Sequence, residues 1–288
     1  MLEVTQNILK EIYSKRPENS KKYDFGLLVV IGGSDFYSGS PALSTLAAFK
    51  AGVDMARIIA PKRAADIIAS FSPIMAVYPL EGKWLAKQHL ATLMSMTEAA
   101  KEVSHGKTAV VIGGGMGRTR ETQEAILEYL EWIQVPAVID ADAIYAVAEK
   151  PSVVKGKNFL FTPHTYEFFI LTGRQVYQLA DEEKIKIVQE EAEKLGATIL
   201  LKGATDIISN GKEVALNRTG SPYMTDGGTG DTLAGIAGAL LARGIEPFLA
   251  GQAAAYINGS AGELAAKKLG ESMTSADLIE EIPNVIRA

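Results

Sequence analysis

Short apolar runs alternate with amphipathic stretches along most of this chain, and this alternation restricts its fold more than any other feature. Strand-like runs separated by helical patterns of about 10–15 residues indicate βαβ units. We therefore expect an α/β fold, with a central, mainly parallel sheet flanked by helices on both faces. The expected strands are Leu27–Ile31, Arg57–Ala60, Ala109–Ile112, Ala137–Ile139, Phe159–Phe161 and Thr198–Leu201. The clearest expected helices are residues 41–51, Glu121–Trp132 and Lys184–Leu195.

The alternation changes in two later parts of the chain. Within Ile207–Leu216, the dipeptide Asn210-Gly211 tolerates positive φ and predicts a tight hairpin turn. From Asp231 onward the chain is rich in alanine and glycine, which predicts closely packed helices. No shift in composition and no low-complexity linker divides the 288 residues, so we expect a single domain over residues 1–288.

Charge and residue usage exclude several classes of protein. The net charge of −5 argues against nucleic acid or an anionic membrane as a partner, because both require a basic face. The chain has no cysteine, which excludes disulfides, thiolate catalysis and zinc–thiolate sites. Residues 1–26 are rich in charge and lack an apolar signal core, and no apolar stretch reaches the roughly 18 residues of a membrane span. We therefore expect a cytoplasmic protein with no membrane partner.

Most of the expected strands end in glycine or in a polar residue. Ligands of open parallel sheets bind outside the carboxyl ends of the strands, so we expect the functional site along this edge. The strand ends in question are Gly32-Gly33-Ser34, Gly113-Gly114-Gly115, Asp140, Thr162-Pro163-His164 and Lys202-Gly203.

The strongest single signal is the segment Thr225–Asp231, which precedes a predicted helix. Glycines at 227, 228 and 230 let the backbone approach an anion closely, and the free amides of a helix start then point at that anion. Asp231 at this place could accept a proton from a substrate hydroxyl. The alternative is a turn whose Asp231 only caps the helix. The length of the segment, with Asn217–Pro222 just upstream and Gly235 and Gly238 in the helix, favours the functional interpretation.

Two further loops are compatible with a ligand site. Residues 31–40 form a strand-to-loop transition able to wrap a ligand, or a plain turn between strand and helix. Gly113–Gly117 with Arg118 forms a flexible loop suited to an anion, although a glycine pattern of this kind is a weak dinucleotide signal by itself.

Acidic and basic side chains at other strand ends leave alternatives open. Asp140 and Asp142 could hold Mg²⁺ directly or through water, or one of them could be a helix N-cap. Glu167 could complete a capping box with His164, or it could orient a magnesium–phosphate group. Lys202 could bind phosphate as a point charge, or be a surface lysine.

The remaining two histidines, His89 and His105, lie in polar surroundings, and we expect both to be solvated.

The order of these motifs resembles the ribokinase-like superfamily, and within it the ADP/ATP-dependent NAD(P)H-hydrate dehydratases. The similar segments cover nearly the whole chain: LLVVIGGSDFYSGSPALSTLAAFKAGVDMARIIAP, VVIGGGMGR, VIDADAI, TPHTYEFFILTG, LLKGATDIIS, NRTGSPYMTDGGTGDTLAGIAGALLARG and INGSAGELAAKK. The resemblance implies a metabolite-repair lyase that returns hydrated NADH or NADPH (NADHX or NADPHX) to the working cofactor. ADP or ATP would be the co-substrate, with Mg²⁺ as cofactor.

The resemblance also implies roles for individual residues. Asp231 would be the catalytic base and contact the hydrated ring, while three more residues would bind that substrate. These are Ser40, Gly115 and His164. The nucleotide would be bound by Lys202, Gly203, Ala204, Thr205, Asp206, Gly228, Thr229 and Gly230. Glu167 and Asp140 would hold the metal.

Three positions depart from the family's pattern, which leaves a different substrate open. Ser40 stands where a small apolar residue is usual, Asp54 where an apolar residue or glycine is typical, and Asn258 where histidine is frequent. The alternatives are a small-molecule kinase on the same fold, acting on a vitamin precursor or sugar, and a non-catalytic nucleotide-binding protein.

Relatives in this family often carry an N-terminal epimerase domain, and too few residues precede the first expected strand for one here. Relatives are often tetramers, so we expect a homo-oligomer.

Overall fold

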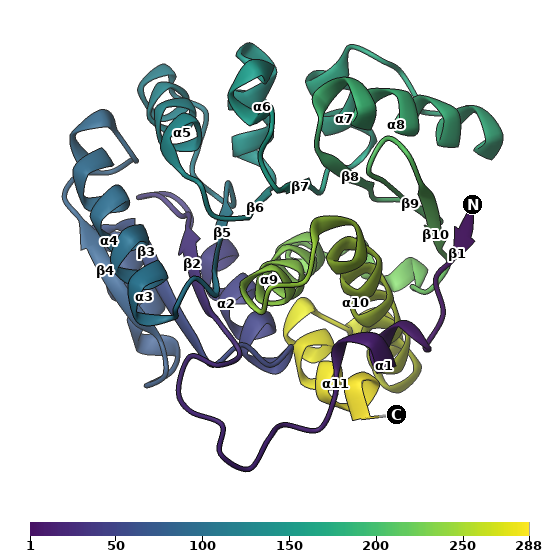
Figure 1. The fold of residues 1–288 in the computed structure, drawn as a ribbon, viewed down its shortest axis with the longest axis horizontal. Coiled ribbons are helices and arrows are strands. Elements are labelled where there is room, and N and C mark those ends of the chain that lie inside the picture. The colour runs from purple at the N-terminus through teal and green to yellow at the C-terminus, as the bar shows by residue number, and fades with distance from the viewer. Residues whose placement is uncertain (288) are drawn as a thin grey trace.

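The structure is a computed structural model that describes residues 1–287. Over these residues it has one ten-stranded sheet in the order β1-β10-β9-β8-β7-β6-β5-β2-β3-β4 (Figure 1). Only β9 runs opposite to its neighbours in this part of the chain. The mainly parallel sheet is therefore confirmed. The strands are β1 (Leu2–Glu3), β2 (Leu27–Ile31), β3 (Met55–Pro61), β4 (Ala76–Leu80), β5 (Thr108–Ile112), β6 (Ala137–Ile139), β7 (Phe159–Phe161), β8 (Thr198–Leu201), β9 (Asp206–Ser209) and β10 (Val214–Asn217).

Helices cover both faces of the sheet (Figure 1). One face carries α4 (Leu90–Val103), α5 (Arg120–Trp132), α6 (Asp142–Glu149), α7 (Thr165–Thr172) and α8 (Asp181–Leu195). The other carries α1 (Ile8–Ile12), α2 (Gly39–Lys50), α3 (Lys62–Phe71), α9 (Thr229–Ala242), α10 (Pro247–Leu269) and α11 (Ser275–Arg287). Within residues 1–287, no helix has both the length and the apolar character needed to cross a membrane.

Burial on both faces explains why the strands are apolar without interruption. Each residue of β2 and of β5 is buried, and alternate side chains enter the two core clusters on opposite sides of the sheet. Central strands of a parallel sheet covered by two helical layers have this continuous apolar character. The same layers leave the loops at the strands' carboxyl ends as the polar surface.

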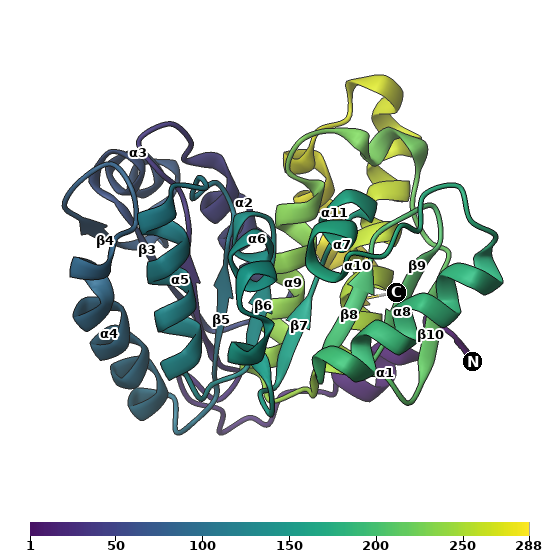
Figure 2. The ribbon, with the colours of Figure 1, turned by 90° about the horizontal axis from the view of Figure 1, so that it is seen from above.

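Several elements were missing from the sequence-based prediction, among them β4, α4, α1 and β1. The strand β4 contains Pro79 and is mostly exposed, which fits its position at the edge of the sheet. Because β4 is not a buried apolar run, the pattern that identified the other strands did not identify it. The helix α4 follows it. The short β1 pairs with β10 at the other end of the sheet, where the N-terminus lies (Figure 2).

The strand order reverses between β2 and β5, because β2, β3 and β4 follow one another in one direction and β5 to β8 in the other. Open α/β sheets bind ligands at such a switch point. Gly33 and Gly114 follow these two strands, and the Gly33 amide donates to the Gly114 carbonyl oxygen at 2.8 Å. The two glycine loops therefore meet where a ligand site is expected.

Candidate active site

The glycine-rich segment ends at the start of α9, where Asp231 lies in the first turn. Gly228 is the N-cap residue with φ of 115°, and no side chain caps the helix. The first amide of α9 that has a backbone partner is that of Thr232, which donates to the Gly228 carbonyl oxygen at 2.9 Å. Within residues 1–287, the amides of Thr229, Gly230 and Asp231 make no backbone hydrogen bond. The helix start is therefore free to bind an anion, and the interpretation of Asp231 as a cap is wrong.

Asp231 is held in a partly buried position between two loops. The Ser44 hydroxyl donates to the Asp231 carbonyl oxygen at 2.9 Å, which ties the start of α9 to α2. Burial raises the pKa of the Asp231 carboxyl to about 7, and the negative charge of Asp140 adds to the rise. The Ser40 hydroxyl and the Lys202 ammonium act in the opposite direction. A carboxyl with a pKa near neutrality is suited to accept a proton during catalysis.

Lys202 lies at the centre of a charged cluster behind Asp231. Its Nζ is 3.3 Å from Asp140 Oδ1 and 3.8 Å from Glu167 Oε2. Burial opposes the charge of Lys202, but Asp140, Glu167 and Asp231 outweigh it and raise the Lys202 pKa above its usual value. The Thr162 hydroxyl donates to the same Asp140 oxygen at 2.7 Å. Lys202 is thus not a surface lysine but a fixed cation beside the Asp231 carboxylate.

Asp140 and Glu167 were predicted to hold Mg²⁺, and Lys202 lies between them. Among the described residues no group of three His, Asp or Glu side chains could enclose a metal ion. Magnesium is commonly bound by only one or two carboxylates together with substrate phosphates and water. The pair Asp140 and Glu167 therefore fits an ion that arrives with a nucleotide, but not a metal held by protein side chains alone.

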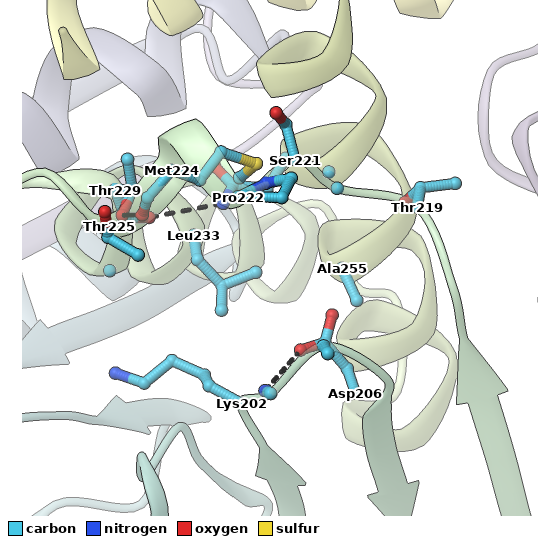
Figure 3. A pocket seen from close by; sticks show the side chains of 16 residues that line it. Lys202, Asp206, Thr219, Ser221, Pro222, Met224, Thr225, Thr229, Leu233 and Ala255 are labelled. Carbon is cyan, nitrogen blue, oxygen red and sulfur yellow. Dashed lines mark hydrogen bonds between the residues drawn. The ribbon is translucent and has the colours of Figure 1, made fainter. Parts of the chain in front are cut away.

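A cavity of about 510 Å³ opens on the other side of Lys202. Figure 3 shows Lys202 and Asp206 facing the segment from Ser221 to Thr225, with Leu233 between them. Six of the residues predicted to bind the nucleotide line it: Lys202, Gly203, Ala204, Asp206, Thr229 and Gly230. The sequence analysis did not assign a ligand role to Thr219, Ser221, Met224, Leu233, Ala255 or Gly259, which also line the cavity. Of these, Thr219 and Ser221 fall in the segment Asn217–Pro222 that it noted beside the glycine loop.

Two of the residues predicted to bind the nucleotide do not line the cavity. The Thr205 hydroxyl instead accepts a hydrogen bond from Arg218 NH1 at 3.1 Å. Gly228 faces Ser275 and Leu43, and a Cβ built on it would lie 2.5 Å from the Ser275 hydroxyl oxygen. Thr205 and Gly228 thus shape the loops around the cavity. Any contact that these two residues make with the nucleotide would come from their backbone groups.

Asp206 organises the loop that follows β8. Its carboxylate accepts from the Gly203 amide and from Asn217 Nδ2, both at 3.0 Å. Burial raises the Asp206 pKa to about 6, although these two donors and Lys202 oppose the rise. The loop is thereby fixed against β10, with its glycine facing the cavity.

Ser40 and Gly115, predicted to bind the second substrate, do not line this cavity. Ser40 is buried at the start of α2. A Cβ built on Gly114 would lie 2.7 Å from Ser40 Cβ and 3.0 Å from Asp231 Oδ1, so these three residues adjoin. The Tyr37 ring covers the next residue, Gly115. Asp231 therefore adjoins the loops predicted to bind the substrate, and its neighbour Gly230 lines the cavity.

His164 and Glu167 form the predicted capping box. The amides of Tyr166 and Glu167 donate to His164 Nδ1 at 3.1 and 3.2 Å, and the His164 amide donates to Glu167 Oε2 at 2.9 Å. The His164 ring is half exposed, and its Nε2 is 3.5 Å from Glu167 Oε1. Glu167 also faces Lys202, so the helix cap and the charged cluster share one carboxylate.

Several other expectations need correction. Asp54 is not part of a substrate wall: it precedes β3 at the opposite edge of the sheet and binds Arg16 NH1 and the Phe25 amide at 2.8 and 2.9 Å. His89 is not solvated but buried, and it accepts the Ala86 amide at 3.0 Å. His105 is exposed, as expected.

The carboxylates that follow β6 do not cap α6. Ala141 is the N-cap residue of that helix, and no side chain caps it. Asp142 turns away from the charged cluster to bind the Gly117 amide and Arg118. Asn258 lines the nucleotide cavity and supports the helix start: Thr232 donates to its Oδ1 at 2.7 Å, and its Nδ2 donates to the Thr229 carbonyl oxygen at 3.2 Å.

Comparison with known proteins agrees with this geometry. A family model described as NAD(P)H-hydrate dehydratase matches residues 28–284. The ADP-dependent (S)-NAD(P)H-hydrate dehydratase of Nitrosopumilus maritimus is 36% identical over 99% of this chain and 96% of its own. The bifunctional NAD(P)H-hydrate repair enzyme of Pyrobaculum aerophilum is 43% identical over 94% of this chain but only 52% of its own. The chain thus spans about half the length of that relative.

The fold has a solved counterpart. A ribokinase-like superfamily protein from Enterococcus faecalis matches with a TM-score of 0.84 and 27% identity, over 99% of this chain and 95% of that one. The expected ribokinase-like fold is therefore confirmed. Because the family model covers most of the chain and a full-length relative shares more than a third of its residues, this chain belongs to the NAD(P)H-hydrate dehydratase family.

Proposed function

We propose that this protein uses ADP or ATP to dehydrate NADHX and NADPHX back to NADH and NADPH. The observation that carries the proposal is the position of Asp231, at a helix start with free amides, beside the cavity proposed for the nucleotide and the loops of Ser40 and Gly115. The match to an ADP-dependent dehydratase over nearly its whole length supports this reaction and the choice of ADP.

The first stage is a phosphoryl transfer. The Asp231 carboxylate accepts the proton of the ring hydroxyl, and that oxygen attacks the terminal phosphorus of the nucleotide. The bond from this phosphorus to the bridging oxygen breaks, so AMP leaves when ADP is the donor. Lys202 and the amides of Thr229 and Gly230 face the place where negative charge gathers. Fixed donors of this kind are the main contribution of the protein to phosphoryl transfer.

The second stage is an elimination from the phosphorylated ring. The lone pair of the ring nitrogen expels phosphate, and loss of a proton from the neighbouring ring carbon restores the dihydropyridine double bond. Phosphate is a far better leaving group than hydroxide, which explains why a nucleotide is consumed. The half-exposed His164 and the buried Ser40 are the proposed walls for this ring.

Mg²⁺ is the proposed metal, and it would neutralise charge on the nucleotide phosphates when bound. Asp140 and Glu167 would hold it, directly or through water. Both carboxylates lie within ion-pair distance of Lys202 Nζ, at 3.3 and 3.8 Å, so the three side chains stay together at this edge of the sheet.

The reaction is tested by incubating the protein with NADHX, Mg²⁺ and either ADP or ATP. We expect absorbance in the NADH band to recover, with one phosphate released for each NADH formed. A stable phosphorylated product without recovery of NADH would instead indicate a kinase, and no turnover with either nucleotide would contradict the proposal.

The protein is proposed to act in the cytoplasm, where reduced nicotinamide nucleotides and ADP occur together, and to form a homo-oligomer. We expect the mass in solution to be that of a tetramer. Light scattering that gives a monomer at micromolar concentration would contradict this.

A further inference from the structure

Arg118 lies in the second glycine loop and is held in one orientation by two contacts. Its Nε donates to Asp142 Oδ1 at 2.7 Å, and its guanidinium carbon lies 3.5 Å from the centroid of the Tyr145 ring. The other oxygen of Asp142 accepts the Gly117 amide at 2.8 Å. One carboxylate therefore fixes both the backbone of the loop and the side chain of Arg118.

This arrangement leaves the terminal amino groups of the guanidinium available. Among residues 1–287, Asp142 is the only carboxylate within ion-pair distance of Arg118, and it takes Nε. The side chain is 51% exposed. A planar guanidinium that is already oriented loses little entropy when it binds a phosphate or carboxylate through two parallel hydrogen bonds.

The loop places Arg118 at the carboxyl edge of the sheet, in the same loop as Gly114, which adjoins Ser40 and Asp231. The Asp142 amide donates to the Gly113 carbonyl oxygen at 3.2 Å, which fastens the loop to the start of α6. Arg118 follows Gly115, which lies beneath Tyr37, and it does not line the nucleotide cavity. Arg118 therefore offers its guanidinium outside the cavity proposed for the nucleotide.

The three carboxylates around Asp231 favour a further cation on this side when an anionic ligand binds. Asp140, Glu167 and Asp231 are carboxylates that share one lysine, Lys202. A dinucleotide carries at least two negative charges on its diphosphate and would meet repulsion here without a compensating group. Arg118 is the cation that the second glycine loop contributes.

We propose that Arg118 binds the diphosphate that bridges the two halves of the hydrated dinucleotide and so positions its ring at Asp231. This inference rests on the proposed function for the identity of the substrate. Arg118 touches no reacting atom in this account, so its loss should weaken binding of the dinucleotide and leave the chemical step largely intact. The effect should be the same for NADHX and NADPHX, because both carry the diphosphate.

The test uses Arg118→Gln and Arg118→Lys, with Arg120→Gln as the matched control. Arg120 lies two residues further on, is 93% exposed and pairs only with Glu124, on the surface of α5. We expect Arg118→Gln to raise KM for both hydrated dinucleotides about tenfold, with kcat within about twofold and the KM for ADP unchanged. Arg118→Lys keeps the charge but not the fork or the stack on Tyr145, so it should recover only part of the loss. Arg120→Gln should behave as the unsubstituted protein.

A binding measurement separates this inference from the proposed reaction. ADP-ribose contains the diphosphate but no reactive ring, and its affinity is measured by calorimetry with a non-hydrolysable ADP analogue filling the nucleotide cavity. Weaker binding to Arg118→Gln supports the assignment even if the protein repairs no hydrated cofactor. Unchanged ADP-ribose binding in Arg118→Gln overturns it, as does a KM change confined to NADPHX, which would assign Arg118 to the 2′-phosphate. Melting temperatures equal to that of the unsubstituted protein are required of each variant, to show that it is folded.

Discussion

Asp231 is the residue whose environment bears most directly on the chemistry. Burial and the neighbouring Asp140 raise its pKa to about 7, so at neutral pH a substantial fraction of the carboxyl is already ionised. A base needs this ionised form, and its strength grows as its pKa approaches the working pH. The side chain is thus a better base than an ordinary aspartate while remaining available to act.

The raised pKa predicts the pH dependence of activity. Because the carboxylate must be ionised, kcat/KM should increase as the pH rises through about 7 and level off above it. The measurement is kcat/KM for NADHX from about pH 5 to 9, with ADP saturating. A value independent of pH across this range would contradict the assignment of Asp231 as the base.

The raised pKa of Asp231 also affects stability, which should fall with rising pH while activity increases. The folded protein retains a proton on Asp231 between the unfolded pKa of 3.8 and the folded value of about 7, so this carboxyl favours the folded state most at low pH. That contribution is lost as the pH rises through about 7. Asp231→Asn removes the free-energy cost of ionising a buried carboxyl. The variant should therefore be more stable than the unsubstituted protein above neutral pH, by on the order of 2 kcal/mol. Urea unfolding at acid and alkaline pH measures it, and a difference between the variant and the unsubstituted protein that does not grow with pH would refute the account.

At the scale of residues, the sequence revealed side chains whose local neighbours define them. The Asp231 segment and the His164–Glu167 capping box were predicted, because three or four adjacent residues carry each signal. Asp54 was misjudged because its partner Arg16 is distant in the sequence. His89 was misjudged because its burial depends on the packing of the fold, although its partner Ala86 is close by in the sequence. The position of Lys202 between two carboxylates depends on the ends of β6 and β8 and on the helix α7, so it could not be found in any one segment.

At the scale of elements, the packing of α9 against α2 positions the base. A Cβ built on Gly235 would overlap the carbonyl oxygen of Ser44, so the helices approach to backbone contact at this point. One turn earlier, the Ser44 hydroxyl donates to the Asp231 carbonyl oxygen. The close packing therefore sets the position of Asp231 relative to Ser40, which begins the same helix as Ser44.

Gly235→Ala is expected to push the two helices apart. Overpacking of this kind costs about 1–3 kcal/mol, and the displaced Asp231 should lower kcat as well. Gly227→Ala is the matched control for stability, because a Cβ on Gly227 would meet no atom within 4 Å. The free energy of unfolding should change little in the control. An equal loss of stability in both variants would mean that the contact with Ser44 is not what requires glycine.

Elements with a clear apolar run or a clear helical periodicity were predictable from the sequence, and the strands at the edges of the sheet were not. The central strands and the helices α5 and α8 appear in the sequence as apolar runs and as periodic stretches, since both faces of the sheet are covered. The edge strand β4 is exposed and contains a proline, so it lacks the apolar signature by which the others were found. The pairing of β1 with β10 joins opposite ends of the chain, which local patterns do not encode.

At the scale of the whole molecule, the sheet brings two binding regions to one carboxylate. The cavity proposed for the nucleotide is built from β8 to β10 with α9 and α10, while the Ser40 and Gly115 loops come from the switch point between β2 and β5. Asp231 lies where the two regions meet. The order of the motifs predicted this division of the chain. The cavity wall formed by Thr219, Met224 and Ala255 could be recognised only from the fold, because α10, which contributes Ala255, is distant in the sequence from the other cavity residues.

The most direct test of the account compares the unsubstituted protein with Asp231→Asn for the repair of NADHX by ADP and Mg²⁺. The unsubstituted protein should form one NADH, one AMP and one phosphate in each turnover. Asp231→Asn should lower kcat about 10³-fold, because the base is lost while the cavity for ADP is intact. ADP binding by the variant, measured by calorimetry, should be unchanged. A variant that repairs NADHX at the rate of the unsubstituted protein would contradict the central claim that Asp231 takes the proton in this reaction.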